Sequence, residues 1–197
     1  MEFISKNTIK LDKEINELDK LVFEFINILK KHTDYVIVSG YVAILLGRSR
    51  TTEDIDVFIK ELDKQKFKAL YRDLQKKWYW CLNGENPDEL YDYLKDGLAI
   101  RFALEPQTTP NFEIKFARKI LDLGALQDTL KVIIKDKELK ISSLERQIAF
   151  KRYYLKSDKD LEDASHIEKL FKEEINKSRI EEYKKLIENE MAKTGKR

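Results

Sequence analysis

The spacing of hydrophobic residues changes along this chain, and each change predicts a different kind of element. Over residues 12–31 apolar side chains recur every three or four positions, which predicts a long amphipathic helix. Two short apolar runs at 35–38 and 54–59 then predict buried strands, separated by a turn and a short helix. From residue 142 onward the pattern is helical throughout. The hydrophobic pattern therefore predicts strands and helices mixed in the first part of the chain and helices alone in the last part.

The remaining elements complete an α+β fold. Further strands are predicted at 78–82, 98–104, 111–116, 132–134 and 139–141, and further helices at 63–77, 87–94, 143–155, 157–171 and 175–192. We expect 98–104 and 111–116 to pair antiparallel beside the strand at 54–59. The fold class predicted is a small mixed β-sheet domain flanked by helices over residues 1–141, followed by an all-helical C-terminal region over residues 142–197.

Two carboxylates follow a small-residue turn at a fixed distance. Ser39 and Gly40 end the first apolar run, and Asp54 and Asp56 lie in the second. Because side chains alternate along a strand, Asp54 and Asp56 project to the same side, roughly 7 Å apart. Mg²⁺ prefers one or two carboxylates together with phosphate oxygens, and backbone N–H groups at a helix start attract phosphate. The spacing predicts a metal-dependent phosphoryl-transfer site, although an Asp-x-Asp at a loop end is also ordinary turn chemistry.

A third acid is expected on a neighbouring strand. Glu113, which lies between apolar residues in the run 111–116, is the first candidate, and Glu105 is the fallback. A carboxylate at this place would complete the metal site or take a proton from an acceptor hydroxyl as a general base. The alternative is that Glu113 is simply an exposed position on a half-buried strand.

Composition and charge restrict the kinds of protein that fit. Charged residues make up 38% of the 197 residues, but they balance to a formal charge of +2, so any nucleic-acid contact must come from a local patch. One cysteine and two histidines permit neither a disulfide nor a zinc cluster of the usual kind. No apolar stretch approaches roughly 18 residues and the N-terminus lacks a signal-peptide pattern, so we expect a cytoplasmic protein without membrane contact.

The turn and the two acids together resemble the signature of the nucleotidyltransferase superfamily, which has a DNA polymerase beta-like fold. In that signature an apolar strand is followed by Gly-Gly or Gly-Ser, a short helix and Asp-x-Asp. The resemblance implies Mg²⁺, two ions with Mn²⁺ as an alternative, held by Asp54, Asp56 and Glu113, and an NTP positioned by Ser39 and Gly40. Ser39 departs from the pattern, because the family usually has glycine there, and serine restricts the backbone unless its hydroxyl supplies a compensating hydrogen bond.

The second half of the chain resembles one branch of that superfamily, the abortive-infection toxin-type nucleotidyltransferases. Lys151 matches a lysine that contacts triphosphate in that branch, and Asp160 and Asp163 match its paired acids, which would support the site or orient Lys151 or Arg152. This resemblance implies a cognate antitoxin protein as a partner. A solvated lysine on an amphipathic helix is the alternative interpretation of Lys151.

The segment between the turn and the acids also resembles the aminoglycoside and lincosamide adenylyltransferases. It contributes Arg48, Ser49 and Arg50 as candidates for nucleotide binding, although the arginines could instead pair with Glu53. The resemblances together imply an enzyme that transfers NMP from an NTP to a hydroxyl of an RNA acceptor such as tRNA, or of a protein, and releases pyrophosphate. The alternatives are a small-molecule adenylyltransferase and a non-catalytic nucleotide-binding or antitoxin-like module.

Overall fold

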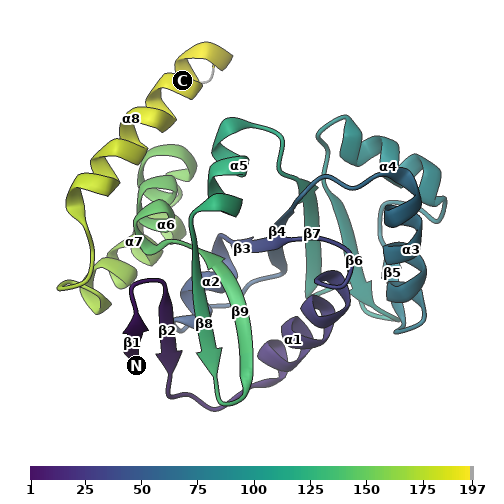
Figure 1. The fold of residues 1–197 in the computed structure, drawn as a ribbon, viewed down its shortest axis with the longest axis horizontal. Helices are drawn as coiled ribbons and strands as arrows, with labels where there is room; N and C mark the ends of the chain where they lie inside the picture. Colours follow the sequence, from purple (N-terminus) through teal and green to yellow (C-terminus); the bar gives the residue numbers. More distant parts are fainter. Residues whose placement is uncertain (196–197) are drawn as a thin grey trace.

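A single mixed sheet is the centre of the structure, a computed structural model that describes residues 1–195. Across these residues nine strands lie in the order β1-β2-β8-β9-β3-β4-β7-β6-β5, so the α+β fold class is confirmed (Figure 1). The strands are β1 (Glu2–Ser5), β2 (Thr8–Leu11), β3 (Tyr35–Val38), β4 (Asp54–Ile59), β5 (Tyr79–Cys81), β6 (Ile100–Leu104), β7 (Asn111–Phe116), β8 (Thr129–Ile134) and β9 (Lys137–Ser142).

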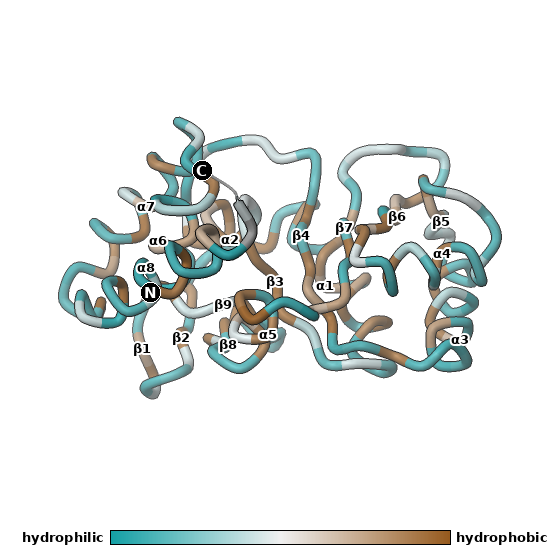
Figure 2. The backbone as a smooth tube through the Cα atoms, turned by 90° about the horizontal axis from the view of Figure 1, so that it is seen from above, coloured by the Kyte–Doolittle hydropathy of each residue, from teal (hydrophilic) through white to brown (hydrophobic). Residues whose placement is uncertain are grey.

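The helices belong to two successive parts of the chain. The N-terminal group comprises α1 (Glu17–Leu29), α2 (Gly40–Leu45), α3 (Lys64–Gln75), α4 (Pro87–Lys95) and α5 (Ile120–Gln127). The C-terminal group comprises α6 (Leu144–Phe150), the π-helical turn η1 (Lys151–Leu155), α7 (Asp158–Leu170) and α8 (Lys177–Thr194). Helices α2 and α5 of the first part lie against the helices of the second. In Figure 2 the helices α6, α7 and α8 lie at the end opposite α3, α4 and β5, with β3 and β4 between them. The helical C-terminal region is confirmed, whereas the predicted domain boundary after residue 141 stays a prediction.

Strand β4 lies between two neighbours that run in different directions. It pairs antiparallel with β3 and parallel with β7, and β7 in turn pairs antiparallel with β6. In the β4–β7 register Asp54 lies opposite Asn111, and Asp56 lies opposite Glu113. The predicted hairpin of β6 and β7, and its place beside β4, are therefore confirmed.

Aromatic packing shows which face of the sheet is the core. Phe25 of α1 stacks on Phe112 of β7 with 3.8 Å between ring centroids, and Tyr71 of α3 lies 6.0 Å from Phe102 of β6. Tyr91 of α4 contacts Phe116 of β7 at 6.0 Å. Helices α1, α3 and α4 thus cover the face to which the apolar residues of β7 point. Because side chains alternate, Asp54, Asp56 and Glu113 stand on the opposite face, which we call the acid face.

Three features of the fold differ from the predicted elements. The N-terminal hairpin of β1 and β2 was not predicted, and β2 joins the sheet by pairing parallel with β8. Helix α5 was not predicted either. The helix predicted at 143–155 is α-helical only to Phe150, continues as η1, and ends at Lys156, whose φ of 64° is a left-handed stop.

Candidate functional site

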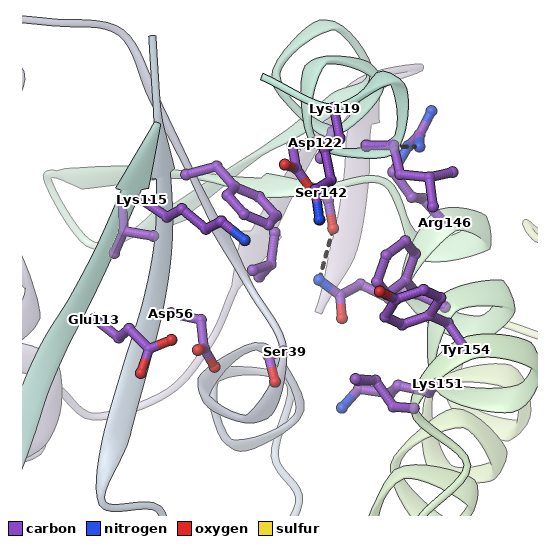
Figure 3. Close-up of a pocket in the computed structure, with 18 residues that line it drawn as sticks. Ser39, Asp56, Glu113, Lys115, Lys119, Asp122, Ser142, Arg146, Lys151 and Tyr154 are labelled. Carbon is purple, nitrogen blue, oxygen red and sulfur yellow. Dashed lines mark hydrogen bonds between the residues drawn. The ribbon is translucent and has the colours of Figure 1, made fainter. Parts of the chain in front are cut away.

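Asp56 and Glu113 are adjacent on the acid face, and both line one cavity (Figure 3). Two other side chains hold the neighbouring acids. The amide of Asn111 donates a hydrogen bond to Asp54 Oδ1 at 2.7 Å, and the guanidinium of Arg101, opposite Glu113 on β6, forms an ion pair with the Glu113 carboxylate. The strands therefore bring the three predicted acids to one face, as their sequence alternation requires.

Asp56 is a buried carboxylate whose neighbouring positive charges do not offset its burial and the acids beside it. Burial, the nearby charge of Glu113 and that of Asp54 together raise the pKa of Asp56 to about 6. A hydrogen bond from the Ser39 hydroxyl and the charge of Lys151 act in the opposite direction. Carboxylates crowded in this way favour an added cation between them.

Ser39 has the backbone conformation that glycine normally supplies. Its φ is 64° and its ψ is −134°, a combination that costs a residue with a Cβ free energy. The turn therefore has an unusual φ, as the sequence predicts, and the Ser39 hydroxyl lowers the pKa of Asp56, an effect that glycine could not supply. Gly40 is buried, and a Cβ there would lie 3.2 Å from Arg50 Nη2.

The cavity has a volume of about 240 Å³ and lies between the acid face and the C-terminal helices. Ser39, Asp56 and Glu113 form one wall, and Lys151 lies on the opposite side. In Figure 3 the Lys151 ammonium points from the C-terminal helices toward the strands that carry the acids. The remaining lining residues include apolar and aromatic side chains from α5, α6 and η1: Leu121, Ala125, Phe150, Tyr154 and Leu155.

Lys151 belongs to a buried cluster centred on Asp163 of α7. Its ammonium lies 2.8 Å from Asp163 Oδ2 and 3.3 Å from Asp160 Oδ1. Asp163 also pairs with Arg48, and its Oδ2 lies 2.5 Å from Arg50 Nη1. Although burial raises it, the hydrogen bond and charge of Lys151 and the arginines bring the pKa of Asp163 below its ordinary value. Asp160 and Asp163 thus both contact Lys151, and their role in orienting it stays a prediction.

The remaining site predictions fall outside the cavity lining. Arg48 and Arg50 contact acids of α7, not Glu53, and Ser49 between them is exposed. Glu105 is exposed beyond the end of β6. A role for Arg48, Ser49 or Arg50 in nucleotide binding stays a prediction.

Sequence reasoning missed two site residues, Arg101 and Asn111. Both alternate with buried apolar residues on their strands, which would have placed them on the acid face once the β6–β7 hairpin was assumed. Their pairing with particular acids depends on the exact register of the strands. A hydrophobic pattern does not determine that register to one residue.

The carboxylate oxygens of the acid face are the donor atoms that a divalent ion would need. Among residues 1–195, no group of three or more histidine, cysteine or acidic side chains is arranged closely enough to hold a metal ion. In this arrangement Arg101 pairs with Glu113, and Asn111 donates a hydrogen bond to Asp54. The donors are nevertheless hard carboxylate oxygens, and Asp56 and Glu113 repel each other, so these residues fit Mg²⁺ or Mn²⁺.

Comparison with known proteins supports the fold. No family model matches the chain and no curated protein matches it. The solution structure of the antibiotic-resistance factor ANT(2'')-Ia is similar, with a TM-score of 0.56 at 14% identity over 90% of this chain and 96% of that one. The crystal structure of ANT(2'')-Ia in complex with adenylyl-2''-tobramycin gives a TM-score of 0.55 at 12% identity over 87% of this chain and 97% of that one.

A third similar structure is that of an antigenic nucleotidyltransferase-like protein from Paracoccidioides brasiliensis. Its TM-score is 0.50 at 20% identity, covering 88% of this chain and 87% of that one. The chain therefore has the fold of these nucleotidyltransferases. The likeness to the abortive-infection branch rests on the sequence alone. None of the helices in the described part of the chain combines the length and apolarity needed to cross a membrane.

Proposed function

We propose that this protein is a nucleotidyltransferase that transfers NMP from an NTP to a hydroxyl group of an acceptor. The observation that carries the proposal is the cross-strand pair of Asp56 and Glu113, with Asp54 on the same face, in a fold shared with nucleotidyltransferases. In this reaction the acceptor oxygen forms a bond to the α-phosphorus, the bond from that phosphorus to the β-phosphate oxygen breaks, and pyrophosphate leaves. The acceptor proton passes to a base.

The acids would hold divalent ions, Mg²⁺ or Mn²⁺, through Asp54, Asp56 and Glu113. When bound, such ions neutralise phosphate charge and hold the attacking and leaving oxygens together. Glu113 completes this site or accepts the proton of the acceptor hydroxyl. Ser39 supports Asp56 by its hydrogen bond.

The cavity suits the nucleotide. Its acid wall would receive the triphosphate, with Ser39 and Gly40 at the turn, and the Lys151 ammonium would face the phosphates from the opposite side. Asp160 and Asp163 hold that ammonium in place, so the charge is positioned before the substrate arrives. The aromatic wall from α6 and η1 offers an apolar surface for the nucleoside.

For the acceptor we favour RNA, for example tRNA, or a protein, in a toxin-antitoxin pair. The second candidate is a small-molecule adenylyltransferase, favoured by the similarity to ANT(2'')-Ia, whose crystal structure contains an adenylylated aminoglycoside. Both candidates transfer NMP from an NTP to a hydroxyl group, and they differ in the molecule that carries this hydroxyl.

Incubation with Mg²⁺ and each α-labelled NTP, with tRNA, total protein and tobramycin as separate acceptors, tests the proposal. We expect label on one acceptor class and stoichiometric pyrophosphate. A parallel reaction with γ-labelled NTP separates NMP transfer from kinase chemistry, because NMP transfer leaves the γ-label in pyrophosphate. Label on no acceptor, together with no thermal shift on adding Mg²⁺ and NTP, would show that the protein is not a nucleotidyltransferase.

A further inference from the structure

The acid face continues past the acids to the edge strand of the sheet. In the cross-strand register Asp54 lies opposite Asn111, Asn111 opposite Ala103, and Ala103 opposite Trp80. Residues paired in this way project to the same face. Since neighbouring strands are about 4.8 Å apart, Trp80 lies roughly 15 Å from Asp54 along one straight row.

Two side chains on this part of the acid face reach solvent, although Asn111 and Ala103, which lie between Asp54 and Trp80 in the row, are buried. Helices α1, α3 and α4 pack on β5, β6 and β7, and their aromatic contacts with Phe112, Phe102 and Phe116 are on the core face. On the acid face the side chain of Arg101 is 43% exposed and Trp80 is 39% exposed. Ala103 and Asn111 themselves are buried, so a ligand that reaches from Trp80 to the acids would contact Trp80 and Arg101 and pass over these two residues.

Trp80 is held in a fixed orientation. Its Nε1 donates a hydrogen bond to the backbone oxygen of Gln107 at 2.9 Å, in the loop that joins β6 to β7. An exposed indole that is fixed in this way offers a π-surface on which a planar group stacks with little loss of side-chain entropy. Trp78, the other tryptophan of the chain, is 71% exposed, but it precedes β5 and lies outside the row.

The positive charge beside this row comes from Arg101, which lies in the neighbouring row opposite Glu113. Arg101, between the acids and Trp80, now pairs with the Glu113 carboxylate, and a phosphate is an equally good partner for a guanidinium. Lys77 is exposed just before β5. A ligand with planar bases and a phosphate backbone matches an indole beside an arginine, whereas an amine-rich sugar would meet a cation there.

We infer that Trp80 and Arg101 form a binding platform for the unpaired end of a single-stranded nucleic acid whose terminal hydroxyl reaches the acids. The terminal base or its neighbour stacks on Trp80, and a backbone phosphate contacts Arg101. This inference rests on the proposed function for the role of that end as the acceptor. It narrows the acceptor to a polynucleotide end, recognised by its bases and phosphates.

The two tryptophans allow a direct test without turnover, because each single-tryptophan variant reports on one indole. Trp78→Phe and Trp80→Phe are titrated, without NTP, with single-stranded RNA and single-stranded DNA of about eight nucleotides, a length within the usual site sizes. We expect either oligonucleotide, or both, to quench the fluorescence of Trp78→Phe, in which Trp80 remains. We expect no quenching of Trp80→Phe. The difference between the RNA and DNA arms identifies the natural source of the end.

Binding of a fluorescently labelled oligonucleotide supplies the second measurement. Trp80→Ala should weaken binding about tenfold, Trp80→Phe should retain most of it, and Trp78→Ala should leave it unchanged. Arg101→Gln should lower the slope of log K against log salt by about 0.7, the value for one phosphate contact on a single strand. A duplex of the same sequence should bind more weakly, because its bases are already stacked.

Quenching of Trp78 alone, wild-type affinity in Trp80→Ala, or equal affinity for duplex and single strand would overturn the inference. Its failure is separate from failure of the proposed function. Transfer of NMP to a small molecule without any quenching of Trp80 would leave the enzyme standing and remove the platform. Quenching of Trp80 with no transfer to any acceptor would support the platform and contradict the proposed enzyme activity.

Discussion

Lys151 and Asp163 form an ion pair in which both side chains are buried, with 2.8 Å between Nζ and Oδ2. Arg48 and Arg50 bind the same carboxylate from the loop that precedes β4. One side chain of α7 thus ties the C-terminal helices to the loop that leads to the Asp-x-Asp strand. The cluster fixes the lysine that faces the cavity.

Asp163→Asn should reduce the free energy of unfolding by about 3 kcal/mol, because it leaves a buried ammonium and two guanidinium groups without their shared counter-charge. Urea denaturation measures this change. Asp160→Asn is the matched control, since Asp160 also contacts Lys151 but is partly exposed, and it should cost less than about 1 kcal/mol. Equal effects of the two substitutions would contradict the central position of Asp163.

The raised pKa of Asp56 predicts a pH dependence of stability. The native carboxyl keeps its proton up to about pH 6, whereas the unfolded carboxyl loses it near the ordinary aspartate pKa of 3.8. Between these values the native state binds more protons, so the contribution of Asp56 to the free energy of unfolding falls as pH rises. In EDTA, Asp56→Asn should therefore match the wild type near pH 4 and exceed it by about 3 kcal/mol at pH 7, as linkage requires for a shift of this size.

Urea denaturation at both pH values, with wild type and Asp56→Asn in parallel, makes that comparison. Mg²⁺ should stabilise the wild type at pH 7.5 and lose this effect below about pH 6, because the ion competes with the proton for the carboxylate. A stability difference between the two proteins that does not vary with pH would show that Asp56 is an ordinary carboxyl.

The φ of 64° at Ser39 predicts that glycine at this position gives a more stable protein than alanine does, the opposite of the usual order. Ser39→Gly and Ser39→Ala both remove the hydroxyl that lowers the pKa of Asp56. The difference in stability between the two variants therefore reports the cost of a Cβ in this backbone conformation. Because a Cβ in this conformation costs about 1–3 kcal/mol, Ser39→Gly should be more stable than Ser39→Ala by about 1 kcal/mol or more. Thermal or urea unfolding of the pair measures the sign. Alanine more stable than glycine, the usual order, would contradict the conformation of the turn.

The ion pair of Arg101 with Glu113 predicts a competition between arginine and metal ion. Arg101→Gln leaves the two adjacent carboxylates without that counter-charge, so it should tighten Mn²⁺ binding severalfold in calorimetric titration without nucleotide. Arg118→Gln is the control, because Arg118 pairs with Glu61 away from the acid face. Weaker Mn²⁺ binding in Arg101→Gln would mean that Arg101 positions Glu113 for the ion and does not compete with it.

Much of the acid side of the site could be predicted from local patterns. Asp54 and Asp56 lie in a strand with buried residues between them, so alternation alone places both on one face. Glu113 lies in a strand of the same kind, and the short connection from β6 to β7 makes their antiparallel pairing the simple topology. These inferences needed only neighbours close in sequence.

Other features depend on contacts between distant segments. The four-residue strand β2 is stabilised by pairing with β8, more than 100 residues away, and its own sequence is too short to signal a strand. Asp163 resembles any acid near a helix start, and only the approach of Arg48 and Arg50 from another segment makes it the centre of a buried cluster. Arg101 lies opposite Glu113 only in the observed β6–β7 register, and a shift of one residue would place it on the core face.

The central claim is that the carboxylates of the acid face carry out NMP transfer, and Asp56→Asn tests it most directly. With the acceptor that the wild type labels, single-turnover transfer from α-labelled NTP in Mg²⁺ should fall at least about a hundredfold in Asp56→Asn, the scale of losing one charged group at the reacting atoms. Glu53→Gln, which changes an exposed acid just before β4, should keep wild-type transfer. Undiminished transfer in Asp56→Asn would contradict the account.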